Sequence, residues 1–219
     1  LRNSSAASDV YKRQDIEMSS GTIDISGGSV NINDELDVAN GTVTISGGTL
    51  SIGTYSGSNS DGGTATTDRF EMDAGTLNLT AGTINIYGQI NSSSYDALDL
   101  ASGVTVNANA NNTINFAAGA GSNDEDMYVK LNDNQLGAVI IANTNNSVFF
   151  EDDLTTLGDL SINSSSTMDI ATGNCDLSLG GAFNNSGTLT SNAETFTFTG
   201  IGNTNIGEIN DAAATITVN

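Results

Sequence analysis

A short unit recurs through the first half of the chain: a glycine, a threonine or serine, and two apolar residues separated by one other residue. Gly21–Ile32 contains it twice, seven residues apart, as Gly-Thr-Ile-Asp-Ile and Gly-Ser-Val-Asn-Ile. Gly41–Ile52, twenty residues further on, and Gly75–Ile86 repeat the pattern. Side chains alternate between the two faces of a strand, so each apolar pair lies on one face. Strands this short bury little alone, so the repeat requires a fold in which similar coils stack.

A third apolar pair precedes each leading glycine, so one coil holds three short strands in about twenty residues. These pairs are Ile16/Met18, Leu36/Val38, Phe70/Met72, Leu98/Leu100 and Met168/Ile170. Stacking at the ~4.8 Å spacing of neighbouring strands would superimpose the apolar side chains in a continuous core. The repeat therefore predicts an all-β fold, a right-handed parallel β-helix with three sides, because parallel crossovers are right-handed. The alternative, a flat β-sandwich, needs longer strands and hairpin turns.

The later part of the chain keeps the apolar alternation with a looser period, and no linker interrupts it. Longer gaps in the repeat predict two insertions, at 53–67 and 88–95, which should form loops at the third corner. We therefore expect one β-helix domain over residues 15–219. Residues 4–14 resemble the translation of a sequencing adapter, so we expect 1–14 to be a disordered, non-native leader. The chain is accordingly expected to be an open-ended metagenomic fragment.

The composition is strongly acidic, with 26 Asp and Glu against 5 Lys and Arg and a net charge of −21. Such a surface repels phosphate backbones and anionic lipids, so we expect no nucleic-acid partner. The sequence has no run of ~18 apolar residues, which predicts no membrane insertion. Cys175, the only cysteine, continues the alternation of Leu177 and Leu179. We therefore expect a buried core residue at this position rather than a reactive thiol.

Three segments of the second half carry a family resemblance. Leu160–Asn163 reads Leu-Ser-Ile-Asn, Leu177–Leu189 reads Leu-Ser-Leu-Gly-Gly-Ala-Phe-Asn-Asn-Ser-Gly-Thr-Leu, and Phe196–Gly200 reads Phe-Thr-Phe-Thr-Gly. They resemble the coils of large secreted, adhesin-like repeat proteins of bacterial cell surfaces, which combine Gly-Phe-x-Asn-x-Gly-Thr-Leu with Phe-Thr-Phe-x-Gly. The inserted Ala182 departs from that pattern. The resemblance implies an extracellular or cell-surface scaffold, with extracellular glycans, other surface proteins and adjoining coils of a longer chain as partners.

Polysaccharide-degrading enzymes are the rival class, because they share the β-helix fold. A lyase on this scaffold needs a basic residue beside calcium-binding carboxylates. Beyond the leader only Arg69 and Lys130 are basic, and neither lies in a recognisable motif. A hydrolase of this fold pairs aspartates with a histidine, and the chain has no histidine. Asp152 and Asp153 are adjacent and should point to opposite faces of a strand, so they do not predict an acid/base couple. We therefore expect no catalysis.

The outward residues between the apolar pairs allow a further alternative. Thr42 and Thr44 form the Thr-x-Thr pattern seen on ice-binding solenoids. The corresponding positions of the neighbouring copies are occupied by Thr22 with Asp24 and by Thr76 with Asn78, which interrupts the pattern. We therefore do not expect an ice-binding array from the sequence.

The acidic residues give the main candidate site. The residue between the third-strand apolar pairs is acidic in five of five cases, namely Glu17, Asp37, Glu71, Asp99 and Asp169. These side chains should face outward, and those in consecutive coils should stack, at a cost on the order of 1 kcal/mol for each neighbouring pair in water. A calcium ion held by Glu17, Asp37, Glu71 and Asp99 would offset that repulsion, since calcium takes several carboxylate oxygens. The alternative, which we favour, is a solvated acidic face without a cofactor.

Together these features predict a structural or adhesion repeat segment of a secreted or cell-surface bacterial protein, without catalysis. The alternative function is a carbohydrate-binding or polysaccharide-degrading β-helix with a calcium-dependent acidic site. The two differ in whether sugar chains are retained or cleaved, and in whether calcium is needed.

Overall fold

The computed structural model of the chain describes residues 15–53, 69–87, 96–118, 126–144, 146–192, 194–200, 208–210 and 215–218. The expected leader, residues 1–14, lies outside the described residues. So do nearly all of the two expected insertions, at 54–67 and 88–95. No helix long and apolar enough to cross a membrane occurs in the described part of the chain.

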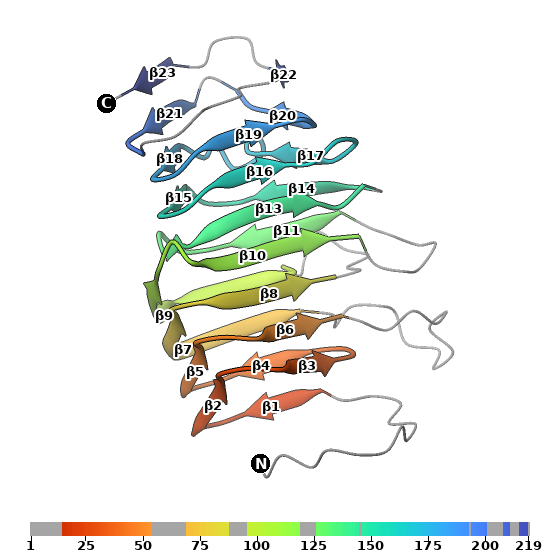
Figure 1. The fold of residues 1–219 in the computed structure, drawn as a ribbon, viewed down its shortest axis with the longest axis vertical. Helices are drawn as coiled ribbons and strands as arrows, with labels where there is room; N and C mark the ends of the chain where they lie inside the picture. Colours follow the sequence, from red (N-terminus) through yellow and green to blue (C-terminus); the bar gives the residue numbers. More distant parts are fainter. Residues whose placement is uncertain are drawn as a thin grey trace.

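The described strands form three sheets in which every pairing is parallel, so the chain folds as the expected three-sided parallel β-helix (Figure 1). The chain climbs from the N-terminal end at the bottom of Figure 1 to the C-terminal end at the top. Successive coils add one strand to each side, as the repeat predicts. We call the three sides the first, second and third faces, in the order in which each coil visits them.

The first face contains the third-strand apolar pairs of the repeat. Its strands, in spatial order, are β1 (Ile16–Met18), β4 (Leu36–Val38), β7 (Phe70–Leu79), β9 (Leu98–Ala108), β11 (Met127–Lys130), β14 (Ser147–Phe150), β17 (Thr167–Asp169), β20 (Thr188–Thr190) and β22 (Glu208–Asn210). The second face is formed by β2 (Thr22–Ile25), β5 (Thr42–Ile45), the C-terminal halves of β7 and β9, and then β12 (Gln135–Leu136), β15 (Leu154–Thr156), β18 (Leu177–Leu179), β21 (Thr195–Phe198) and β23 (Thr215–Val218).

The third face runs up the front of the molecule in Figure 1. It contains β3 (Ser29–Ile32), β6 (Thr49–Ile52), β8 (Gly82–Ile86), β10 (Asn112–Ala117), β13 (Ala138–Ala142), β16 (Leu160–Ile162) and β19 (Phe183–Asn185).

Register places apolar side chains over one another inside the coil. One internal row consists of Leu36, Phe70, Leu98, Val129 and Phe150, which are paired from strand to strand and fully buried. Each such side chain contributes roughly 1.5–3 kcal/mol by leaving water. Because all three faces direct their apolar residues inward, one continuous hydrophobic cluster fills the interior from coil to coil.

Stacked glycines form the corner between the first and second faces. Gly41 and Gly75 adopt φ of +151° and +109°, in the region that favours glycine. A Cβ on Gly75 would overlap the carbonyl oxygen of Gly41 directly below it. The sequence predicts a break between strands at these glycines. In the later coils, however, β7 and β9 continue through Gly75 and Gly103 as single long strands that turn the corner.

Candidate functional site

The register of the first face brings the predicted acidic residues together. Glu17 lies opposite Asp37, Asp37 opposite Glu71, and Glu71 opposite Asp99, on four neighbouring strands. Each residue lies between two inward apolar side chains, so its own side chain faces outward. The alignment predicted from the repeat therefore exists, and we call these four residues the acidic row.

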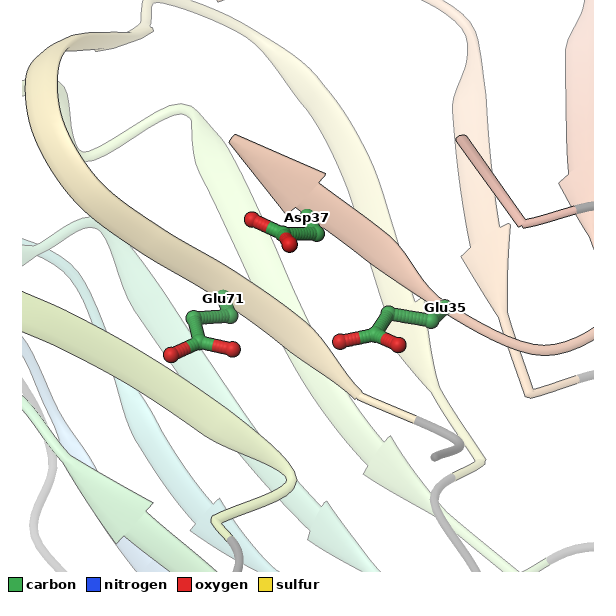
Figure 2. Close-up of side chains that lie close together, drawn as sticks. All are labelled: Glu35, Asp37 and Glu71. Carbon is green, nitrogen blue, oxygen red and sulfur yellow. The ribbon is translucent and has the colours of Figure 1, made fainter. Parts of the chain in front are cut away.

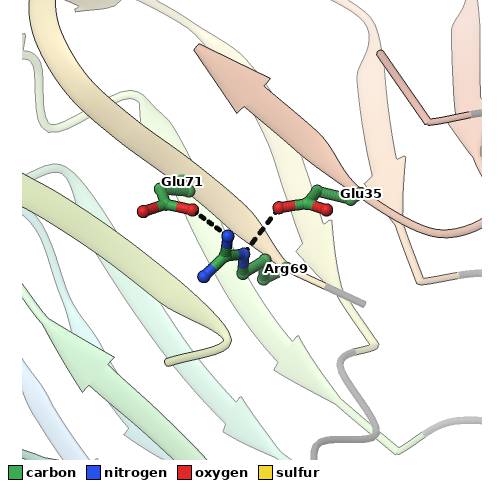
Figure 3. A network of polar contacts seen from close by, with 3 residues as sticks. All are labelled: Glu35, Arg69 and Glu71. Atoms are coloured by element: carbon green, nitrogen blue, oxygen red, sulfur yellow. Dashed lines mark hydrogen bonds and ion pairs between the residues drawn. The ribbon is translucent and has the colours of Figure 1, made fainter. Parts of the chain in front are cut away.

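Arg69 inserts a positive charge at the side of the acidic row. Its Nε donates to Glu35 Oε1 at 2.6 Å, and its Nη2 forms an ion pair with Glu71 (Figure 3). Arg69 lies one residue before β7 and Glu35 one residue before β4, so the register that pairs Leu36 with Phe70 places them side by side. The guanidinium therefore links two consecutive coils on their outer surface.

The electrostatic surroundings of Arg69 match this geometry. Partial burial lowers the pKa of the guanidinium, but the bonded Glu35 and the nearby Glu71 and Asp37 outweigh burial and raise it. For Glu71 burial is the largest influence and raises the pKa of the carboxyl above its ordinary value, against the opposing effect of Arg69. The ion pair is therefore partly screened from water, and its side chains are between 14% and 21% exposed.

Glu35, Asp37 and Glu71 each direct a carboxylate oxygen into one small volume (Figure 2). The three oxygens lie within 4.8 Å of one another, a spacing that could hold a metal ion. The sequence prediction included Asp37 and Glu71 but missed Glu35. Glu35 and Asp37 are separated by one residue in an extended segment, so they point the same way, and that spacing was the available signal.

The arrangement can act in two chemical ways. The three carboxylates could bind a cation, or they could be held by the Arg69 guanidinium, which already contacts Glu35 and Glu71. One oxygen of Asp37 and one of Asp99 are buried without a hydrogen-bond partner in the described structure. Burying a carboxylate oxygen without a partner is costly, and these two atoms are the part of the site that Arg69 does not satisfy.

The acidic row ends at Lys130, which lies opposite Asp99 on β11. Burial raises the pKa of Asp99, whereas Lys130 and Arg69 lower it. Asp96, just before β9, is also affected: burial, followed by the charges of Glu151 and Asp99, raises the pKa of its carboxyl to about 6. This end of the row therefore contains carboxyl groups that protonate more readily than exposed ones.

Asp169 faces outward on the first face, as predicted, but it lies outside the acidic row. It lies opposite Phe149 and Thr190, and Phe149 lies opposite Tyr128. Val129 pairs with Leu98, so Tyr128 is one residue ahead of that pair, in line with Ala97 and not with Asp99. Asp169 is therefore in register with Arg69 of an earlier coil. This position lies two residues before the acidic row along each strand.

Many other acidic side chains connect coils through the backbone. Asp153 accepts the N–H of Asp176, and Asp176 in turn accepts the N–H of Thr195, at 2.8 and 2.7 Å. Asp152 accepts the N–H groups of Leu131 and Asn132 in the preceding coil. Asp159 and Asp126 make similar bonds to the N–H groups of Ala182 and Ser147. Each bond joins residues about one coil apart, so these carboxylates have a structural role at the corners.

The prediction that Asp152 and Asp153 occupy a strand is wrong. They lie in the corner between β14 and β15 and not within a strand. Each is engaged by backbone N–H groups of a different neighbouring coil.

Cys175 is fully buried in the core, as predicted. Its Sγ donates to the carbonyl oxygen of Phe150 at 3.1 Å. Burial, followed by the charges of Asp153 and Asp152, raises the pKa of the thiol to about 12. A thiol with that pKa is not ionised near neutral pH, so it lacks the thiolate needed for nucleophilic reactivity.

Comparison with protein-family models, with curated proteins and with solved structures gave no match for this chain.

Proposed function

We propose that the chain is a structural or adhesion repeat segment of a secreted or cell-surface bacterial protein, and that it catalyses no reaction. Its partners would be extracellular glycans, other surface proteins and adjoining coils of a longer chain. The resemblance of Leu177–Leu189 and Phe196–Gly200 to repeat proteins of bacterial cell surfaces supports this proposal. The strongly acidic composition also supports it, because exposed charges are screened in a salty medium.

One observation carries the proposal: the charged side chains are used to connect coils. Arg69 joins Glu35 of one coil to Glu71 of its own. Asp152, Asp153 and Asp176 accept backbone N–H groups from neighbouring coils. Hydrogen bonds to charged groups are worth about 1.5–3 kcal/mol each. Charged side chains that bind neighbouring coils stabilise a rigid scaffold, so their use here favours a structural role over a reaction centre.

A screen against acidic and neutral polysaccharides tests this proposal. The purified chain is incubated with each polymer, and both retention and the release of unsaturated or reducing sugar ends are measured. A scaffold or adhesion segment is expected to release no sugar ends, with or without retention. Release of unsaturated or reducing sugar ends, with or without calcium, would overturn the proposal.

A carbohydrate-binding or polysaccharide-degrading β-helix with a calcium site is the second candidate. The observation that favours it is the convergence of Glu35, Asp37 and Glu71 within 4.8 Å. Repeating the screen with calcium and with a chelator addresses this candidate. Retention that requires calcium would support it, and retention that is indifferent to calcium would not.

A further inference from the structure

The second face differs in chemistry from the acidic first face. Four threonines, Thr22, Thr42, Thr76 and Thr105, lie opposite one another on consecutive coils. We call them the threonine row. Beside it runs a second outward row of Asp24, Thr44, Asn78 and Asn107. As complete Thr-x-Thr pairs the array is interrupted, because the second position varies. The register shows that the first position is threonine in all four coils.

The hydroxyl-bearing surface continues along the upper coils of the same face. There the outward row consists of Gln135, Thr155, Ser178, Thr197 and Thr217. Among the described strand residues of the second face, Asp24 is the only charged one, although the chain has 26 acidic residues. None of the outward residues on these described strands is aromatic. By contrast, the first face exposes carboxylates and a stacked pair of rings, Tyr128 and Phe149, with centroids 5.1 Å apart.

Hydrogen bonds connect three side chains in the row beside the threonine row. The Asn107 amide donates to Asn78 Oδ1 at 2.8 Å, and the Asn78 amide donates to Thr44 Oγ1 at 3.2 Å. Threonine is β-branched, so its χ1 angle is restricted and its hydroxyl and methyl groups keep a defined direction. A surface ordered before contact loses little conformational entropy on binding a flat partner.

We propose that the second face adsorbs to ice, with the threonine row at its centre. Strand geometry sets the outward groups roughly 4.8 Å apart between coils and roughly 6.6 Å apart along each strand. Oxygen atoms repeat at similar distances on the faces of ordinary ice crystals, so hydroxyl and amide groups on this grid can take the place of lattice water molecules. A hydroxyl-rich face whose described strands carry one carboxylate and no outward ring suits such a partner better than a glycan, for which exposed aromatic rings usually provide stacking surfaces. This inference goes beyond the proposed scaffold role, because it names a partner and a face.

Thermal hysteresis, ice-crystal shape and inhibition of ice recrystallisation, measured on the full purified chain, test the proposal. The wild-type chain is expected to shape ice crystals and to inhibit recrystallisation. Thr76→Tyr places a large ring in the middle of the threonine row and should abolish both effects. Thr105→Lys, at an exposed position of the same row, should weaken them strongly. Circular dichroism and melting temperature establish that each variant is folded.

Thr167→Tyr is the matched control, since Thr167 is an outward strand threonine of similar exposure on the first face. It should leave the ice activity unchanged. A folded wild-type chain without ice activity would overturn the proposal, as would a folded Thr76→Tyr variant that retains the activity or a Thr167→Tyr variant that loses it. If the wild-type chain is inactive on ice and Thr76→Tyr instead abolishes retention on a neutral polysaccharide, the occupant of the face is a glycan and the proposal is wrong.

Discussion

Arg69 occupies the place beside Glu35 and Glu71 where a bound metal ion would otherwise reduce carboxylate repulsion. A guanidinium is always charged at ordinary pH and presents several donors in one plane, so it can contact two carboxylates at once. Both of its carboxylate partners are mostly buried. The chain therefore supplies one cation of its own to the acidic row, a possibility that neither the calcium hypothesis nor the solvated-face hypothesis includes.

Replacing Arg69 should expose this dependence. Arg69→Gln removes the ion pairs and leaves Glu35, Asp37 and Glu71 converging without a cation, so we expect a loss of about 1–3 kcal/mol of stability. Millimolar calcium should restore part of it, because a ligand that binds only the folded state stabilises that state. Thermal melts with calcium, and with sodium at equal ionic strength, measure both effects. Equal stability of the variant and the wild type would contradict the assigned role of Arg69.

Asp37→Asn separates the two hypotheses for the wild-type chain. If the row binds no calcium, removing one of several neighbouring like charges should stabilise the fold slightly, by about 0.2–1 kcal/mol. Calcium should then act no differently from sodium, and this is the result we expect. Destabilisation of the variant that appears only when calcium is present would instead identify Asp37 as a calcium ligand. The measurement is a thermal melt of both proteins with and without the ion.

At the level of strands and corners, Gly75 is a position where a single methyl group should be costly. Gly75→Ala should destabilise the fold by at least about 1–3 kcal/mol, because alanine is strained at φ of +109° and its Cβ would overlap the Gly41 carbonyl. Gly103→Ala is the control one coil higher, where a Cβ would lie 3.1 Å from its nearest neighbour and φ is not in the left-handed region. Chemical denaturation of both variants should show a clearly smaller loss for Gly103→Ala.

The arrangement of the strands could be predicted from the repeat because each coil must bury the same alternating pattern. The position of Asp169 relative to the acidic row could not be predicted in this way. A parallel strand that shifts by two residues against its neighbour still points the same kind of side chain inward, so the apolar pattern does not reveal the shift. Val129 pairs with Leu98 and Phe150, and that choice places Asp169 outside the acidic row. Such a register depends on corner geometry, which the pattern does not encode.

The contact between Arg69 and Glu35 could have been found from the sequence. Each residue immediately precedes the first apolar residue of its first-face strand, so the two occupy equivalent positions in consecutive coils. Comparing the residues that immediately precede the apolar pairs of consecutive coils therefore predicts the ion pair. The buried oxygens of Asp37 and Asp99, in contrast, depend on how neighbouring side chains pack, and no spacing in the sequence indicates them.

On the scale of the whole molecule, charge is divided between faces. The first face carries the acidic row with Arg69 and Lys130, whereas the described strands of the second face present hydroxyls, amides and one carboxylate. A net charge of −21 acts against the compact state through mutual repulsion. The stability of the solenoid should therefore respond to pH chiefly through the first face, where carboxyl groups are crowded and partly buried.

Acidification from pH 7.5 to 5.5 should raise the melting temperature. Burial raises the pKa of Asp96 to about 6 and raises the pKa values of Asp99 and Glu71, whereas an unfolded Asp titrates near 3.9. A carboxyl whose pKa is higher in the folded chain favours folding when protonated. The stabilisation of the folded state by such a carboxyl is fully present below about pH 4 and is lost as the pH rises through about 6. Melts at constant ionic strength should show the increase.

Asp96→Asn should reduce this increase in melting temperature, because asparagine cannot titrate, while the general relief of repulsion on acidification remains in both proteins. An unchanged pH response in the folded variant would show that Asp96 does not carry this effect, and a melting temperature that falls between pH 7.5 and 5.5 would contradict the raised pKa values of the first face.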